Sequence, residues 1–215
     1  MSRRLPARNV IAFNDKRPLQ SPPPEAAREL LSLTRQIVII GFMGAGKSTV
    51  ARAVASLLNG LMTDLDEAIT SSEGRSPAQI IEQDGEKHFR QIETQTLRDV
   101  LAEGAARVVA VGGGAWTIAE NRKLISDYGA LSVWLDAPFE LCWTRIDAGQ
   151  QARPLAPSRE LAEKLYYERR SVYALANARI TIGENESVAE IAARLVAELS
   201  RQDANSVETS EIKAL

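Results

Sequence analysis

Gly41-Phe42-Met43-Gly44-Ala45-Gly46-Lys47-Ser48 stands between the apolar run 36–40 and the alanine-rich segment 47–58. These eight residues match G-x-x-x-x-G-K-[ST], a pattern whose glycines let the backbone wrap around a phosphate with its N–H groups pointing inward. The β-branched run predicts a buried parallel strand, and the following segment predicts a helix whose N-terminus attracts anions. We therefore expect a strand–loop–helix unit that binds the phosphates of a nucleotide. The alternative is a glycine-rich turn in which the lysine occurs by chance.

The motif residues have separate expected tasks. Lys47 can reach the β- and γ-phosphates, which makes it a candidate catalytic residue. The Ser48 hydroxyl can bind Mg²⁺, a hard cation that prefers oxygen ligands. The residues expected to contact the nucleotide here are Gly44, Ala45, Gly46, Lys47, Ser48 and Thr49.

Strands and helices alternate along the rest of the chain. Short apolar runs predict strands at 36–40, 61–63, 107–111, 131–135 and 178–182. Helical patterns occupy 47–58, 121–128, 139–147, 159–175 and 187–199, and 67–101 is helical with breaks near Gly74 and Asp84-Gly85. This order predicts an α/β fold, a three-layer α/β/α sandwich around a mostly five-stranded parallel sheet.

The chain divides into one domain and two flanking segments. Residues 36–200 form the expected domain. Residues 1–35 are basic and poor in acidic residues, which predicts a disordered or weakly ordered extension, with a transit peptide as the alternative. Residues 201–215 are polar and are expected to fray.

Composition excludes several classes of protein. The 215 residues carry a net charge of −2, which gives no general attraction to nucleic acid or an anionic membrane. No apolar run approaches the roughly 18–20 residues needed to span a bilayer. The single cysteine, Cys142, excludes an internal disulfide and a cysteine-based zinc site, and it fits a reducing, cytoplasmic compartment. We expect a monomer.

Two carboxylates follow the second expected strand, at Asp64 and Asp66. Alternation along an extended segment sends both to one side, at the sheet edge where ligands of α/β folds bind. One could hold Mg²⁺ through its waters, and the other could accept a proton from a substrate hydroxyl. The alternative is that Asp66 only caps the helix beginning at Glu67.

The order and spacing of five segments resemble those of shikimate kinases. The resemblance covers roughly 37–199, and the segments are 41–50, 64–66, 85–93 (GEKHFRQIE), 112–115 (GGGA) and 153–155 (RPL). It implies a P-loop kinase that uses Mg²⁺ and ATP to phosphorylate shikimate, with a substrate-binding helical insert at 68–97 and a lid at 149–159. A related kinase for another carboxylated polyol or gluconate, or a ligand-sensing regulator, are the competing hypotheses.

The resemblance also implies individual roles. Asp66 would hold ring hydroxyls and act as the base, while Arg90 would clamp the acceptor carboxylate and Glu93 would orient a substrate-binding arginine. Ser48 with Asp64 would bind the metal. Arg153 would close over the transferring phosphate as a catalytic and ATP-binding residue. The remaining expected contacts are Gly112, Gly113, Gly114 and Arg169 to the substrate and Arg145 to ATP.

Some of these assignments keep an alternative. Arg90 could be a surface arginine that pairs with Glu86 four residues earlier. Arg153 could be a solvated loop charge. Ser171 stands where the family usually has proline, so either Arg169 or Arg170 could be the substrate ligand; the distance to Tyr173 favours Arg169.

Overall fold

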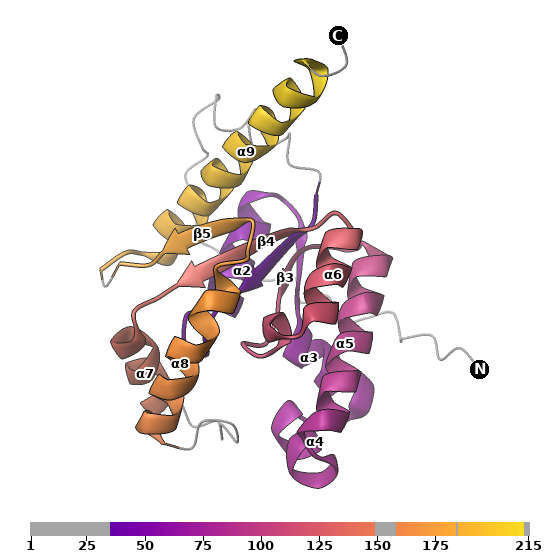
Figure 1. Ribbon diagram of the computed structural model, residues 1–215, viewed down its shortest axis with the longest axis vertical. Helices are drawn as coiled ribbons and strands as arrows, with labels where there is room; N and C mark the ends of the chain where they lie inside the picture. Colours follow the sequence, from indigo (N-terminus) through magenta and orange to yellow (C-terminus); the bar gives the residue numbers. More distant parts are fainter. Residues whose placement is uncertain (1–34, 149–157, 184, 213–215) are drawn as a thin grey trace, which may run out of the picture.

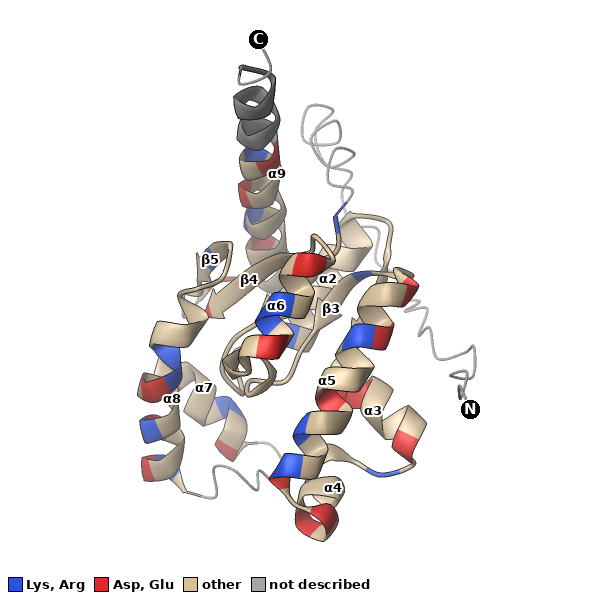
Figure 2. Ribbon diagram, turned by 45° about the vertical axis from the view of Figure 1, so that its right-hand side comes forward, with Lys and Arg blue, Asp and Glu red and all other residues tan. Residues whose placement is uncertain are grey.

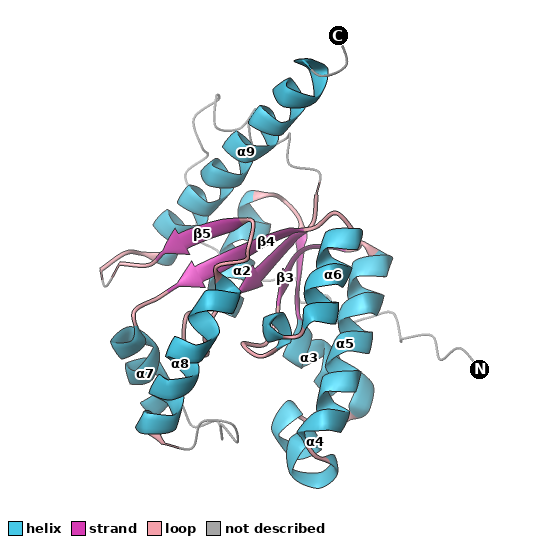
Figure 3. Cartoon of the chain, in the orientation of Figure 1, coloured by secondary structure: helices cyan, strands magenta, loops and turns pink. Residues whose placement is uncertain are grey.

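The central strand β1 (Ile37–Ile40) is fully buried and lies between β3 (Ala106–Ala110) and β4 (Leu131–Asp136). The computed structural model describes residues 35–148, 158–183 and 185–212. Within these ranges β2 (Leu61–Asp64) and β5 (Ala178–Thr181) complete a five-stranded parallel sheet in the order β2-β3-β1-β4-β5. Figure 3 shows the strands in magenta among the cyan helices. The predicted sheet is confirmed.

The strand register brings the carboxyl ends of the strands to one edge. Ile39 pairs with Ala110, Ile40 with Trp134, and Asp64 with Ala110. The residues that follow β1, β2, β3 and β4 therefore lie beside one another, although they come from distant parts of the sequence. In a parallel sheet this edge is where ligands bind.

Helices cover both faces of the sheet. In Figure 1, α5 (Glu86–Glu103), α6 (Ala119–Asp127) and α8 (Arg159–Tyr173) lie in front of the sheet, and α2 (Lys47–Leu57) lies behind it. Helix α2 packs against β1, β3 and the last helix, α9. The three-layer architecture predicted from the alternation of elements is thus confirmed.

The helical insert breaks where glycine interrupts the pattern. Helix α3 (Leu65–Glu73) ends at Gly74 with φ 68°, and α4 (Pro77–Asp84) ends at Gly85 with φ 85°. Ser76 begins α4 with a capping box, in which its hydroxyl accepts from the Gln79 backbone and the Gln79 side chain accepts from the Ser76 backbone. The predicted interruptions are therefore confirmed.

The end of the chain differs from the expectation. Helix α9 (Val188–Ile212) continues beyond Leu199, where the sequence pattern predicted its end. Residues 200–212 contain neither glycine nor proline, so nothing local breaks the helix. The short helix η1 (Ala115–Thr117) was not predicted, whereas α7 (Phe139–Asp147) was. Residues 149–157 of the expected lid 149–159, with Arg153, and residues 1–34 of the expected extension 1–35 lie outside the described residues. The end of the expected lid, Ser158 and Arg159, is the N-cap and first residue of α8.

The surface carries both signs of charge. Figure 2 shows Lys and Arg interspersed with Asp and Glu along α5, α6, α8 and α9. His88 is exposed, whereas Phe89, Trp116, Trp134 and Cys142 are buried. None of the helices in the described ranges is both long enough and apolar enough to cross a membrane.

Candidate active site

The loop after β1 requires glycine where it passes close to neighbouring backbone. Gly41 has φ 145°, and a Cβ there would lie 2.7 Å from the carbonyl oxygen of Leu135 on β4. Gly44 has φ 77°, and a Cβ there would collide with the carbonyl oxygen of Cys142 on α7. The loop is therefore wedged between two elements, which fixes its shape.

The loop residues expected to contact ATP lie around the start of α2. Lys47 Nζ donates to the Phe42 carbonyl at 3.0 Å, so the lysine side chain folds back over the loop. Phe42 is buried and packs edge-on against Tyr166 of α8, with ring centroids 5.3 Å apart. Arg145 of α7 donates to the Gly44 carbonyl at 3.1 Å, which places its guanidinium against the same loop.

Asp64 connects the loop to the second strand. The Ser48 hydroxyl donates to Asp64 Oδ2 at 2.5 Å, and Asp64 Oδ1 accepts from the Asp66 backbone N–H at 3.0 Å. Asp64 is therefore the N-cap of α3. The alternative that Asp66 caps a helix beginning at Glu67 is wrong, because Asp66 lies within the first turn.

Arg90 is held by two glutamates on its own helix. Its guanidinium donates to buried Glu93 at 2.7 Å and to exposed Glu86 at 3.0 and 3.2 Å. Burial alone would lower the pKa of Arg90, but the charges and hydrogen bonds of Glu93 and Glu86 raise it. The expected pair with Glu86 is present, but it uses only part of the Arg90 guanidinium, which also binds buried Glu93. The Arg90 side chain is 18% exposed, so it is not a surface arginine.

Glu93 lies at the centre of a charged cluster. Its side chain is 1% exposed, and burial raises its pKa to about 7. Arg90 opposes this increase, Asp66 adds to it, and Arg169 opposes it, so all three charges lie near Glu93. Glu93 Oε1 accepts no hydrogen bond within the described part of the chain. This carboxylate therefore joins Arg90, Asp66 and Arg169 in one place.

The segment Gly112-Gly113-Gly114 after β3 passes through this cluster. A Cβ at Gly112 would lie 3.0 Å from Glu93 Oε1 and 3.3 Å from Asp66 Oδ1, and one at Gly114 would collide with the Arg90 guanidinium. A Cβ at Gly113 would lie 3.2 Å from the Gly41 carbonyl and 3.5 Å from the Met43 nitrogen. The glycine backbone of residues 112–114 thus lies close both to the phosphate-binding loop and to the side chains of Glu93, Asp66 and Arg90.

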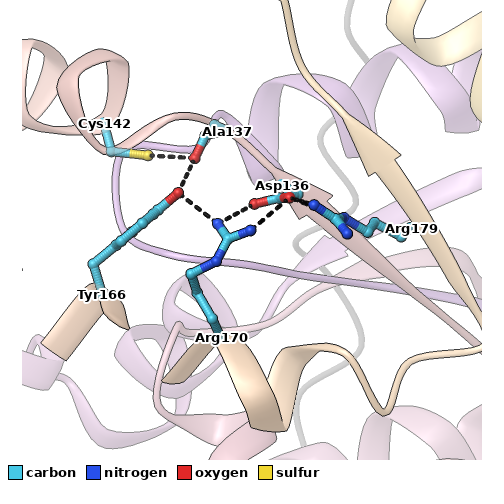
Figure 4. Close-up of polar contacts among 6 residues, drawn as sticks. All are labelled: Asp136, Ala137, Cys142, Tyr166, Arg170 and Arg179. Atoms are coloured by element: carbon cyan, nitrogen blue, oxygen red, sulfur yellow. Dashed lines mark hydrogen bonds and ion pairs between the residues drawn. The ribbon is translucent and has the colours of Figure 1, made fainter. Parts of the chain in front are cut away.

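The two neighbouring arginines of α8 point to different places. Arg170 donates to both carboxylate oxygens of Asp136, as Figure 4 shows. Burial raises the pKa of Tyr173 to about 12, and the positive charge of Arg169 opposes this increase, so Arg169 lies near the Tyr173 hydroxyl. Since Arg169 also lowers the pKa of Glu93, the structure places Arg169, rather than Arg170, beside the cluster.

Comparison with known proteins agrees with this geometry. The protein-family model described as "Shikimate kinase" matches residues 43–200. A shikimate kinase of Ruegeria pomeroyi is 36% identical over 172 residues, which cover 79% of this chain and 87% of that protein. The chain belongs to the shikimate kinase family.

The fold of this shikimate kinase family member is also similar to those of solved structures. A shikimate kinase from Acinetobacter baumannii in complex with shikimate has a TM-score of 0.71 and 32% identity, and the match covers 84% of this chain and 98% of that one. The shikimate kinase of Aquifex aeolicus has a TM-score of 0.65 and 30% identity, and the match covers 80% of this chain and 98% of that one. A gluconokinase from Sinorhizobium meliloti, 20% identical with a TM-score of 0.53, shares the fold.

Asp136 and Arg179 were not singled out by the sequence analysis. Asp136 is the last residue of β4, as Asp64 is the last residue of β2, so its position at the end of a strand was the available signal. Arg179 lies on β5 and gives no local signal of an ion pair with a residue 43 positions away. Cys142 remains a packing residue, because burial raises the pKa of its thiol to about 11 and disfavours the reactive thiolate.

The buried state of Glu93 predicts a specific pH dependence of stability. Folded Glu93 keeps its proton up to about pH 7, whereas its ordinary pKa is 4.5, so the folded protein binds more protons between these values. The unfolding free energy should therefore fall as pH rises through this window, by about 3 kcal/mol from this group. Glu93→Gln should remove that slope in urea unfolding from pH 5 to pH 8.

Glu86→Gln is the matched control, because Glu86 also pairs with Arg90 but is 50% exposed. Its slope should equal that of the unmodified protein. Equal slopes in all three proteins would contradict the buried, protonated state of Glu93.

Proposed function

We infer that this enzyme transfers the γ-phosphate of ATP to a hydroxyl of shikimate, giving shikimate 3-phosphate and ADP, a step in the biosynthesis of chorismate and aromatic amino acids. The observation that carries this proposal is the path of residues 112–114. Their backbone approaches the phosphate-binding loop at Gly41 on one side and Asp66 and Arg90 on the other. A nucleotide phosphate and a small acceptor can therefore meet at this edge of the sheet.

The acceptor side suits a carboxylated polyol. Arg90 and Arg169 are both close enough to Glu93 to affect its pKa, so their guanidinium groups can bind one carboxylate. Glu93 orients Arg90 through the 2.7 Å hydrogen bond. The backbone of 112–114 brings further donors and acceptors to the ring hydroxyls. A neutral sugar offers these arginines no carboxylate for charge-assisted hydrogen bonds, so its binding is expected to be weaker.

The chemistry requires positioning and charge neutralisation more than covalent catalysis. Asp66 accepts the proton of the attacking hydroxyl. Lys47 neutralises charge on the β- and γ-phosphates, and the N–H groups of Gly44, Ala45, Gly46, Ser48 and Thr49 surround them. Arg145 approaches the nucleotide from α7. Arg153 is proposed as the residue that covers the transferring phosphate; it lies outside the described residues.

The donor set beside the loop fits Mg²⁺. Ser48 and Asp64 offer two adjacent oxygen ligands, joined by a 2.5 Å hydrogen bond. Among the described residues no group of three or more His, Cys, Asp or Glu could enclose a metal ion. Mg²⁺ commonly uses one or two protein ligands together with phosphates and water. When bound, it would neutralise phosphate charge.

The remaining properties follow from composition. A net charge of −2 gives no general attraction to nucleic acid or anionic membranes, and a single cysteine suits a reducing compartment. We propose a cytoplasmic monomer whose partners are ATP and shikimate.

An assay of ADP release with shikimate, quinate and gluconate in parallel tests the assignment. We expect Mg²⁺-dependent turnover with shikimate and at most about a hundredth of its kcat/KM with gluconate, because gluconate cannot present a ring carboxylate and hydroxyls in the same geometry. Preference for gluconate would replace the proposal with a related kinase. ATP binding without turnover of any acceptor would favour a ligand-sensing regulator.

Asp66→Asn should lower kcat about 10²–10⁴-fold, because an amide cannot accept the hydroxyl proton. The Kd for ATP should change less than about twofold, since Asp66 lies on the acceptor side of residues 112–114. The matched control is Asp127→Asn on α6, whose side chain is 52% exposed. Turnover of the Asp66 variant comparable with that of the control would remove Asp66 from the base role.

Arg90→Ala should raise the KM for shikimate about 10–100-fold, the range expected for the loss of a charged hydrogen bond. The KM for ATP should stay within about twofold. Arg98→Ala on the same helix, which removes a surface pair with Glu120, should change neither constant. Equal increases in both KM values after the Arg90 substitution would show that Arg90 does not bind the acceptor specifically.

A further inference from the structure

The carboxylate of Asp136 holds together three elements outside the reacting centre. Its side chain is 6% exposed, and its oxygens accept from Arg170 of α8 at 2.7 and 3.2 Å and from Arg179 of β5 at 2.9 Å (Figure 4). Both guanidinium groups also lie over the Trp134 ring, 5.1 and 4.8 Å from its centre. Two cations therefore share one buried anion and one aromatic face.

Arg170 fixes one side of the last turns of α8. Besides Asp136, it donates to the Tyr166 hydroxyl at 2.7 Å, and that hydroxyl donates to the Ala137 carbonyl at 2.9 Å. Tyr166 and Arg170 are four residues apart and thus lie on the same face of the helix. This face of α8 is bound to residues 136–137, at the carboxyl end of the fully buried strand β4.

Other contacts fix the end of α8 against the substrate side. The Tyr173 hydroxyl donates to the Gly113 carbonyl at 2.6 Å, and Trp116 Nε1 donates to the Val172 carbonyl at 2.8 Å. The charge of Arg169 lowers the pKa of Tyr173, so Arg169 lies on the same side of the helix end. Consecutive residues of a helix point about 100° apart. Any rotation of α8 that moved Arg170 would therefore move Arg169 relative to Glu93.

We propose that the Asp136–Arg170 ion pair is a positioning device that sets the rotation of α8 and thereby aims Arg169 at the carboxylate of the acceptor. The inference rests on the proposed function, because it assigns Arg169 to that carboxylate. Arg170 touches no substrate in this scheme and acts only through its neighbour.

Orientation, rather than stability, is the expected contribution of this pair. A buried ion pair often adds little net stability, since desolvation offsets the attraction. Loss of Arg170 would still leave Asp136 paired with Arg179. The planar guanidinium, however, binds both oxygens of Asp136 and so restricts the direction of the helix. Small displacements of a binding group have large effects on substrate positioning.

Arg179 provides a matched control within the same cluster. Like Arg170, it pairs with Asp136 and lies over Trp134, but it belongs to β5 and does not hold α8. Arg170→Met should raise the KM for shikimate about five- to tenfold while kcat and the KM for ATP stay within about twofold. Arg179→Met should leave all three within about twofold. Equal increases in the shikimate KM for both variants, or no increase for Arg170→Met, would overturn the inference.

A double-mutant cycle with Arg169 tests the route of the effect. In an Arg169→Ala background, Arg170→Met should cause no further increase in the shikimate KM, because the group that it positions is gone. Multiplicative effects of the two substitutions would overturn the inference. Arg170→Lys keeps the charge but loses the planar contact, and it should still raise the shikimate KM about threefold. This variant decides the question if Arg170→Met does not fold, and an unchanged KM would count against the inference.

Measuring shikimate turnover by the unmodified enzyme distinguishes failure of this inference from failure of the proposed function. Failure of that enzyme to phosphorylate shikimate would refute the function and with it the stated target of Arg169. Normal turnover by the unmodified enzyme, with unchanged kinetics in the Arg170 variants, would refute only the positioning role.

Discussion

The close approach of bare backbone to charged side chains at residues 112–114 is the constraint on which the site depends. A side chain at Gly114 would occupy the position of the Arg90 guanidinium, and one at Gly112 would press on Glu93 and Asp66. The parallel register of β1 and β3 delivers this segment next to the phosphate-binding loop. The phosphate-binding loop and residues 112–114 each follow a strand of the sheet, so the sheet fixes their separation. In the proposed site, backbone geometry rather than flexible side chains therefore sets the distance between the nucleotide and the acceptor.

The acceptor side is electrostatically balanced around one buried acid. Glu93 is nearly inaccessible, so its ionised form is costly, yet Arg90 and Arg169 both favour ionisation. Asp66 acts in the opposite direction. A bound carboxylate would add another anion between the arginines, and it would favour the protonated form of Glu93 further. If the acceptor binds as proposed, its affinity should therefore be coupled to the protonation of Glu93, although Glu93 need not contact the substrate.

Local sequence patterns predicted the parts of this structure that depend on neighbouring residues. The phosphate-binding loop, the five strands and the helix breaks at Gly74 and Gly85 all follow from short motifs, and the structure has them. The alternative in which Asp66 caps the helix was wrong, because Asp64 and Asp66 are equally good capping residues and the helix begins two residues earlier than expected, at Leu65. The partners of Asp136 lie 34 and 43 residues away, so no local pattern could reveal them.

The two arginines of α8 show why residue type alone cannot assign a role. Both have the same charge and adjacent positions, but helix geometry gives one to Glu93 and Tyr173 and the other to Asp136. The serine at position 171 removed the family landmark that would have fixed the register. Asp136 at the end of β4 binds Arg170, whose side chain points about 100° away from that of Arg169 around the helix axis. In the proposed scheme, binding of the acceptor carboxylate by Arg169 thus depends on Arg170 being held by Asp136.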